Sequence, residues 1–411
     1  MDCDRSTAHA LALAAIVSLL PVVLCAQTDD PVGAARFRLG PIGITPGITV
    51  SAGVDSNVMA VETLPQDDVM TIVNPQVHSA MRTRWMILNV QTSVDSVNYQ
   101  QFTEQGGVNW RNDTRVEIPL NRIRLSVTHS LINTQQRATF EIDARARRDE
   151  TTLGAGADIR MTGKTSLRLG ATRSEMAFGD DAVNLGVNLA DTLNRRIDVA
   201  TIAFRYQLTR STTLALSGDA VRAGFERSPI RNSESLRLTP GVEFDRYAII
   251  SGRAYAGYRR FTITSGLAPT FTGPVAAVEL SSVIRGTTRL GLQLSRDVSY
   301  SYDVTTPYYL LSTGGLSLGR RLGERWEITG NAAKNILGYR SSRLVAADPE
   351  PASPGLTIRR DYVYSYGGGL DYKISESVRC GIRAEHIRRD SGVALHGYRA
   401  TRVLASIGYG M

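Results

Sequence analysis

The sequence contains very little cysteine. Only three cysteines occur in 411 residues, and two of them, Cys3 and Cys25, lie within the first 26 residues. A mature chain that begins after residue 26 keeps Cys380 alone, so no intramolecular disulfide can form. That is unusual for a soluble domain of this size in an oxidising compartment, so the composition argues against a disulfide-stabilised secreted domain.

Long apolar runs are also missing. Beyond the N-terminal segment no stretch approaches the ~18 apolar residues of a membrane-spanning helix, although 42% of the residues are hydrophobic. This excludes a helical membrane protein. The formal net charge is +8, but an exported basic chain meets little nucleic acid, so we expect no nucleic-acid partner.

Motifs for metal or nucleotide chemistry are scarce as well. The five histidines never occur in His-x-x-x-His, His-Glu-x-x-His or cysteine-paired spacing, and the chain has no P-loop. The sequence therefore predicts no enzyme, no cofactor and no metal site. An acyl hydrolase or protease site assembled from neighbouring strands stays open as an alternative.

The first 26 residues have the pattern of an export signal. Ala10 to Leu24 is an apolar run, followed by Cys25, Ala26 and the polar stretch QTDD. Because this run is too short to span a bilayer as a helix, we expect a signal peptide over residues 1–26, cut near Ala26. An uncleaved anchor is the alternative.

Apolar and polar residues alternate along the stretch TTRLGLQLSRDVSYSY, which begins at Thr287. Its leucines, Val298, Tyr300 and Tyr302 share one parity, and polar residues or glycine hold the other. This is the period of a β-strand with one apolar face. In a membrane barrel the apolar face meets lipid and the polar face lines a wet lumen.

The same alternation recurs after tight polar turns along most of the chain, and we count eighteen candidate strands, with sixteen also compatible. An even number is expected for a single-chain bacterial barrel. The predicted fold is therefore all-β: a transmembrane antiparallel up-and-down β-barrel over residues 43–411. A periplasmic N-terminal segment over residues 27–42 precedes it.

The connections between the predicted strands are unequal in length. Tight turns alternate with long connections such as those that begin at Gly179 and Ser341. Short turns belong to the periplasmic side and long loops to the outside. We expect the Pro-rich, acidic stretch Asp348 to Pro354 to be a solvated outer loop.

The polar parity of the strands carries more cations than anions. The candidate lumen-lining residues are Arg124, Arg168, Arg237, Arg253, Arg289, Arg379, Arg383, Lys373 and Arg402. The acidic residues of the same parity are Asp95, Glu243, Asp297, Asp371 and Glu385. A cationic bore favours anionic solutes or acidic polysaccharide. The alternative is that these arginines form salt bridges across the lumen and stiffen the wall.

Three cations break the alternation. Arg173, Arg296 and Lys334 have the parity of the apolar residues. A lipid-facing cation costs ~2–4 kcal/mol at the bilayer midplane and far less near an interface. The sequence allows either snorkelling to the interface or a β-bulge that turns the side chain inward.

Aromatic residues lie near the predicted strand ends. We expect them to form girdles at the membrane interfaces, as in other membrane barrels. They include Tyr300, Tyr302, Tyr362, Tyr364 and Trp85.

The most specific sequence pattern is RFRLGPIGITPGITVSAGVDSNVMA, Arg36 to Ala60. The basic-aromatic start, the Gly-Pro pair, the second proline and the Asp-Ser-Asn ending resemble the opening strand of an outer-membrane β-barrel porin family. This family is often associated with exopolysaccharide export. The turn spacing is similar over nearly the whole mature length. The last strand departs from the pattern, because it ends on Met411 and not on the aromatic residue common in barrel-assembly signals.

Together these features predict a porin-like passive channel for hydrophilic solutes in the outer membrane of a Gram-negative-type bacterium. Anionic solutes or polysaccharide are the favoured classes. The expected partners are outer-membrane lipid, the barrel-assembly machinery and, from the resemblance, polysaccharide-export proteins. Alternatives are a structural or adhesive barrel with a closed lumen, a component of an exopolysaccharide export system, and a soluble β-repeat protein. The sequence leaves the oligomeric state open.

Overall fold

The computed structural model describes residues 35–246, 248–266, 268–342, 359–393 and 396–410. The signal peptide predicted over residues 1–26 and the loop predicted from Asp348 to Pro354 lie outside these ranges.

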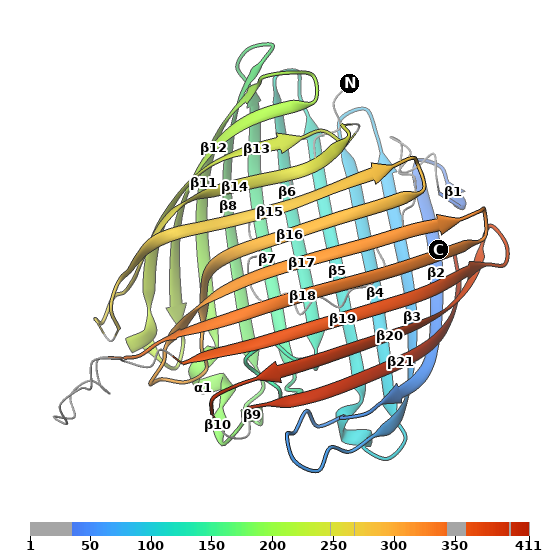
Figure 1. Cartoon of the computed structure of the whole chain (residues 1–411). Coiled ribbons are helices and arrows are strands. Elements are labelled where there is room, and N and C mark those ends of the chain that lie inside the picture. Colours follow the sequence, from blue (N-terminus) through green and yellow to red (C-terminus); the bar gives the residue numbers. More distant parts are fainter. Residues whose placement is uncertain (1–34, 247, 267, 343–358, 394–395, 411) are drawn as a thin grey trace.

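Eighteen antiparallel strands form one closed barrel (Figure 1). The strands are β2 (Ile42–Asp55), β3 (Asp68–Arg82), β4 (Ile87–Tyr99), β5 (Gly107–Pro119), β6 (Ile123–Thr134), β7 (Arg148–Arg160), β8 (Thr165–Phe178), β11 (Arg195–Gln207), β12 (Thr212–Phe225), β13 (Ser233–Phe244), β14 (Ile250–Ile263), β15 (Phe271–Ile284), β16 (Thr288–Tyr300), β17 (Tyr308–Leu322), β18 (Trp326–Arg340), β19 (Arg360–Lys373), β20 (Val378–Asp390) and β21 (Tyr398–Tyr409). The predicted all-β barrel of eighteen strands is confirmed.

The barrel closes where β2 pairs with β21. Gly53 has no side chain at this seam, and a Cβ there would lie 1.8 Å from the carbonyl oxygen of Val403. The short strand β1 (Phe37–Leu39) pairs with the start of β2. Part of the segment predicted to precede the barrel therefore runs beside its first strand.

Side chains alternate between the two faces of the wall as the period of a strand requires. Leu236 and Leu238 on β13 are 65% and 56% exposed on the outside. Between them Arg237 points inward, and its Nε donates to Asp219 Oδ2 at 2.9 Å. The apolar side faces lipid and the polar side faces the lumen, which is the reverse of a soluble sandwich.

The two ends of the barrel differ. One end, which we call the turn end, has tight connections, whereas the other, the loop end, has the long ones. The connection from β8 to β11 holds β9 (Val183–Asn184), β10 (Val187–Asn188) and α1 (Leu189–Leu193), which gather at the loop end in Figure 1. Two 3-10 helices, η1 (Thr103–Gln105) and η2 (Pro229–Arg231), also lie in loop-end connections. By the rule for such barrels, the turn end is periplasmic. No helix in the described ranges has both the length and the apolar character needed to cross a membrane.

The ladder between β15 and β16 stops before the loop end. Its nine residue pairs run from Ile284 opposite Thr288 to Ala276 opposite Arg296. Beyond them β15 still pairs with β14, and β16 still pairs with β17. Residues 297–308, which we call the hairpin tip, therefore separate from β15 and bend into the lumen.

This bend corrects two expectations. Val298, Tyr300 and Tyr302 are only 8%, 9% and 5% exposed. Val298 and Tyr300 pack with apolar residues of β11, β12, β14 and β15, and Tyr302 packs with loop-end residues. The prediction that these three side chains face outward, with Tyr300 and Tyr302 in an interfacial girdle, is wrong. The apolar parity continues past Arg296, but the strand no longer lies in the wall.

The three exceptional cations keep their outward parity. The ladders around Arg173 and Lys334 are continuous, so no bulge turns either side chain inward. Arg173 Nε lies 2.6 Å from Asp198 Oδ1 on the next strand. Lys334 Nζ lies 5.2 Å from the ring centroids of both Tyr362 and Tyr364, which stabilises the cation at the outer surface. Arg296 is exposed at the point where the β15–β16 ladder ends.

Candidate functional site: a polar lumen

A cavity of about 2470 Å³ lies inside the barrel. It reaches from the loop-end connection between β6 and β7 to tight turns such as those at Arg122 and Lys164. Seventeen Lys and Arg residues line it, against eleven Asp and Glu, among the described residues. The inward parity of many strands therefore lines one polar space.

The nine predicted lumen cations divide into two groups. Six line the cavity: Arg124, Arg168, Arg237, Arg253, Arg383 and Arg402. The other three, Arg289, Lys373 and Arg379, have inward parity but lie close to the tight turns, outside the cavity lining. Lys373 Nζ lies 2.8 Å from Glu376 Oε1 in the β19–β20 turn.

Most of the arginines deep in the lumen have carboxylate partners on neighbouring strands. Arg168 pairs with Asp158 at 2.6 Å and Arg253 with Glu279 at 2.8 Å. Arg237 contacts both Asp219 at 2.9 Å and Asp297 at 3.0 Å. Because these pairs neutralise the guanidinium charges along the wall, the middle of the bore is far less cationic than its arginine count indicates.

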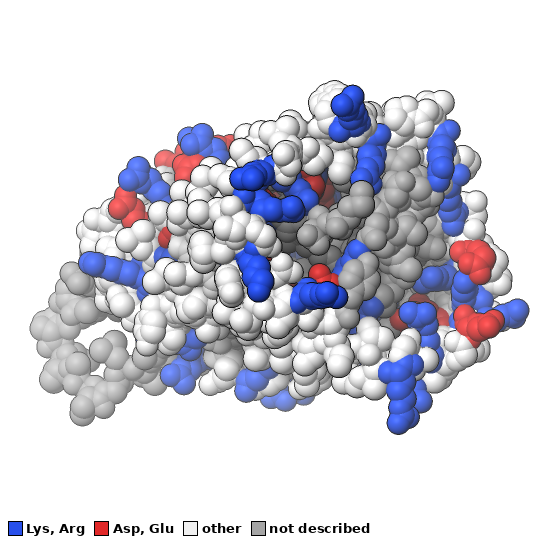
Figure 2. All heavy atoms as spheres, turned by 90° about the horizontal axis from the view of Figure 1, so that it is seen from above, with Lys and Arg blue, Asp and Glu red and all other residues white. Residues whose placement is uncertain are grey.

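The turn-end mouth is different. Arg122, Arg160, Lys164 and Arg210 line the cavity there, and none of them forms an ion pair within the described ranges. Figure 2, which looks onto this end, shows Lys and Arg side chains around a central hollow. Most of the uncompensated positive charge of the lumen is therefore at the mouth.

The connection between β6 and β7, residues 135–147, folds into the barrel, and we call it the inner loop. Its Phe140 packs against Tyr309, Leu337 and Val363 on strands β17 to β19. Its Ile142 packs with Leu189 of α1 and with Tyr302 of the hairpin tip. The inner loop thus bridges the bore and narrows its loop end.

Glu141 attaches the inner loop to the hairpin tip. The hydroxyl of Ser301 donates to Glu141 Oε1 at 2.5 Å, and the Tyr302 N–H donates to Oε2 at 3.1 Å. Glu141 is 1% exposed. Burial raises the pKa of its carboxyl to about 7, against the hydrogen bonds from Ser301 and Tyr302 and the charges of Arg389 and Arg359, which lower it.

A buried ion network supports the other side of the inner loop. Arg389 on β20 has a fully buried side chain and donates to Asp361 at 2.8 Å and to Asp143 at 2.5 Å. It also donates to the carbonyl oxygen of Glu141 at 3.1 Å. Sequence reasoning missed this network, because its members come from loops and distant strands.

The Asp-Ser-Asn stretch of the first strand closes the seam at the loop end. Asp55 Oδ2 accepts from Arg402 at 2.8 Å and lies 3.5 Å from Arg145 of the inner loop. Asn57 Nδ2 donates to the carbonyl oxygen of Arg399 at 2.9 Å. This stretch therefore joins β2, β21 and the inner loop.

A family model described as "Putative beta-barrel porin 2" matches residues 30–409 of this sequence. The chain belongs to this porin family. A search of curated proteins found no match. Among solved structures, the chain is similar to OccK3 (OpdO) of Pseudomonas aeruginosa, with 9% identity, a TM-score of 0.45 and coverage of 89% of this chain and 95% of that one. It is also similar to a BenF-like porin of Pseudomonas fluorescens Pf-5, with 10% identity, a TM-score of 0.47 and coverage of 89% and 98%.

The porin is a Gram-negative outer-membrane β-barrel. One stretch of the porin matches the Gly-x-Ser-x-Gly pattern of hydrolases: Gly315 to Gly319 reads Gly-Leu-Ser-Leu-Gly. The motif requires a sharp strand-to-helix turn, but these residues lie inside β17, paired on both sides. Ser317 is therefore an ordinary lumen residue of the porin. No group of three or more His, Cys, Asp or Glu residues in the described ranges is arranged to hold a metal ion.

Proposed function

We propose that this porin conducts small hydrophilic solutes passively and prefers anions, and that the preference is set at the turn-end mouth. The observation that carries the proposal is the position of the unpaired charge. Arg122, Arg160, Lys164 and Arg210 line the mouth without ion partners in the described chain, whereas Arg168, Arg237 and Arg253 are paired with carboxylates. An entrance of one sign concentrates counter-ions and sets ionic preference.

The magnitude follows from Coulomb's law. A unit charge ~8 Å from a passing ion contributes ~0.5 kcal/mol in water, which is about twofold in relative permeability before screening. Reversing two charges at the mouth changes the local charge by four units. We expect this to remove the anion preference or invert it at low salt.

The test is a reversal-potential measurement in a planar bilayer under a salt gradient. The mouth variant is Arg122→Glu with Arg210→Glu. The control is Arg222→Glu, an outward arginine whose side chain is 76% exposed, so it adds negative charge outside the bore. Wild-type protein and control are expected to prefer chloride over potassium, and the mouth variant is expected to lose that preference. Cation preference of the wild-type protein contradicts the proposal, and absence of stepwise conductance favours a closed structural barrel.

We also propose that residues 1–26 are removed on export and that the barrel-assembly machinery inserts the chain. The mass of the mature protein tests the cleavage. The resemblance of the first strand to porins associated with polysaccharide export supports a further proposal, that polysaccharide-export proteins are its partners. Loss of surface polysaccharide after deletion of the gene is the expected result, and unchanged polysaccharide contradicts it. We propose no catalytic activity.

A further inference from the structure

We call the stretch Phe271–Val275, where β15 has no partner on β16, the β15–β16 break. We propose that the apolar cluster behind this break binds a single-chain anionic amphiphile, a fatty carboxylate, which enters from the outer leaflet through the break. This site is separate from the hydrophilic route proposed above. Three observations support it: an unpaired stretch of wall, an apolar interior behind it, and buried arginines that form no ion pair within the described residues.

The wall at the break is held by side chains and not by a backbone ladder. Phe271–Val275 of β15 have no partners on β16, and Pro274 within this stretch has no N–H to donate, as expected at a sheet edge. The Tyr300 hydroxyl lies 2.7 Å from Ser233 Oγ, and the Tyr308 hydroxyl donates to the carbonyl oxygen of Pro269 at 2.8 Å. The hairpin tip can therefore move without breaking the ladder between β15 and β16.

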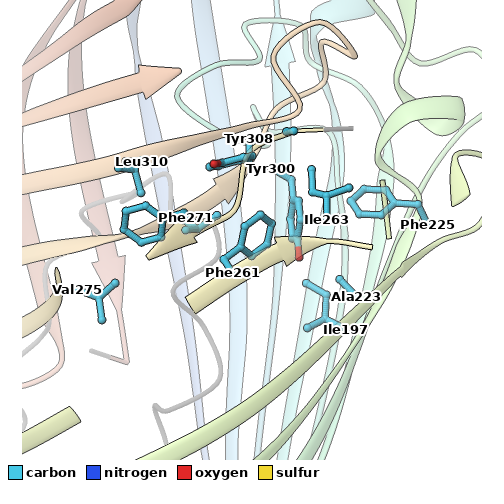
Figure 3. Close-up of a cluster of buried hydrophobic side chains, with 12 residues drawn as sticks. Ile197, Ala223, Phe225, Phe261, Ile263, Phe271, Val275, Tyr300, Tyr308 and Leu310 are labelled. Atoms are coloured by element: carbon cyan, nitrogen blue, oxygen red, sulfur yellow. The ribbon is translucent and has the colours of Figure 1, made fainter. Parts of the chain in front are cut away.

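The apolar cluster lies directly behind the break (Figure 3). Its buried members are Ile197, Ala223, Phe225, Phe261, Ile263, Ala268, Phe271, Val275, Val298, Tyr300, Tyr308 and Leu310. Phe261 is central to it: its ring centroid lies 5.0 Å from that of Tyr308 and 5.9 Å from that of Tyr300. The lumen cavity reaches residues on both edges of the break, Val275 and Ala276 on β15 and Arg296 and Val298 on β16. A hydrocarbon chain that displaced the tip would meet apolar side chains, with the lumen beyond them.

Two arginines at this cluster are buried and form no ion pair within the part of the chain that the structure describes. Arg195 is 7% exposed, and its guanidinium carbon lies 5.4 Å from the Tyr300 ring centroid. Its Nη1 donates to the carbonyl oxygen of Leu193, and its Nε has no partner among the described residues. Arg231 is 1% exposed and, among the described residues, donates to the carbonyl oxygens of Thr192, Ser301 and Pro307. Buried unpaired charges are costly, so a carboxylate bound beside these guanidiniums would be stabilised.

The outer side of the break also presents positive charge. Arg260, opposite Thr272 at the unpaired edge, and Arg296, at the last ladder pair, are both exposed. Neither forms an ion pair within the described ranges, whereas Arg222 at a similar height pairs with Glu234 at 2.9 Å. An anionic headgroup would therefore be attracted at the entrance, and its chain would be accepted by the cluster.

The test is photolabelling with a diazirine-bearing dodecanoate on the porin in phospholipid vesicles. We expect saturable labelling of Phe271–Val275 and of Val298–Leu310, which unlabelled dodecanoate competes away and dodecyl trimethylammonium does not. Arg195→Gln should weaken labelling about tenfold, because it removes a charged partner of the carboxylate. Arg222→Gln, which removes an outward paired arginine, should leave it unchanged. Label that spreads evenly over the lipid-facing strands and resists competition would overturn the proposal.

A reversible cross-link tests whether binding at this site can be blocked while the bore still conducts. In a Cys380→Ser background, Phe225→Cys and Tyr300→Cys, joined by a short reducible bis-thiosulfonate, would tie the tip to β12. The ring centroids of the two native residues are 5.1 Å apart. We expect labelling to disappear in the locked protein and to return on reduction, which also shows that the protein is folded, while conductance stays measurable throughout. Leu280→Cys with Leu292→Cys, an existing ladder pair, should leave labelling unchanged. Equal labelling in locked and reduced protein would contradict the proposal.

Discussion

The sharpest prediction concerns Glu141→Gln. The carboxyl of Glu141 is buried between the inner loop and the hairpin tip, and burial raises its pKa from 4.5 to about 7. When the inner loop is undocked and solvated, the same group has its ordinary pKa. Docking therefore binds a proton between pH 4.5 and 7, so the docked loop is most stable below pH 4.5 and loses stability as pH rises to about 7.

The size of the effect follows from the shift. A change from 4.5 to about 7 corresponds to about 3 kcal/mol, or on the order of a hundredfold in the docking equilibrium. Several polar or charged groups on neighbouring elements interact electrostatically with the Glu141 carboxyl and contribute to its pKa or share its environment: Arg231, Arg359, Arg389, Tyr302, Tyr309 and Tyr339. In Glu141→Gln the amide oxygen can accept from the Tyr302 N–H and the amide NH2 can donate to Ser301 Oγ, but the side chain cannot ionise.

The assay is single-channel recording with the loop-end chamber at pH 5 and then at pH 8. We expect the wild-type porin to spend more time in a higher-conductance state at pH 8, and Glu141→Gln to behave at both values as the wild type does at pH 5. Glu104→Gln, a change at an exposed loop carboxylate, is the control and should follow the wild type. If Glu141→Gln keeps the wild-type response, or if the wild type shows none, the proposed protonation step is wrong.

Two further predictions test the wall and its buried charges. Asp361→Ala leaves the fully buried Arg389 without its 2.8 Å partner. We expect this to destabilise the barrel by about 3–5 kcal/mol in denaturant unfolding from lipid vesicles. A loss of stability below about 1 kcal/mol would contradict the role of the network. Leu294→Arg places a cation on the lipid face, where Leu294 is 43% exposed, and should destabilise the barrel by ~2–4 kcal/mol. Gln293→Arg, one residue before it on the lumen face, should change stability little, and equal effects would show that the two faces are not distinct.

The barrel itself was predictable because the two faces of each strand meet different solvents. Leu236 and Leu238 alternate with Arg237, and the structure places them on opposite sides of the wall. Parity also placed Arg237 in the lumen, but it could not reveal that Asp219 and Asp297 neutralise it, because that depends on register and on the bend of β16. The turn-end charge was therefore harder to infer than the fold.

The hairpin tip shows where parity fails. Val298 and Tyr300 continue the apolar side of β16, and lipid and an apolar cluster attract the same residue types. Local sequence cannot distinguish the two environments. The Glu141 site was equally hidden, because loops have no hydrophobic period and its partners Ser301 and Arg389 are 160 and 248 residues away in the chain.

Cysteine accessibility along β16 tests the reversed amphipathicity of this porin most directly. Single cysteines at residues 290, 291, 293, 294 and 295, in a Cys380→Ser background, would be exposed to a membrane-impermeant thiol reagent in intact vesicles. We predict that positions 291, 293 and 295 react from the aqueous bore and that positions 290 and 294 do not, because Leu290 and Leu294 are each 43% exposed on the lipid side and do not line the cavity. Reaction at the leucine positions equal to that at their neighbours would contradict a lipid-facing apolar surface around a wet lumen.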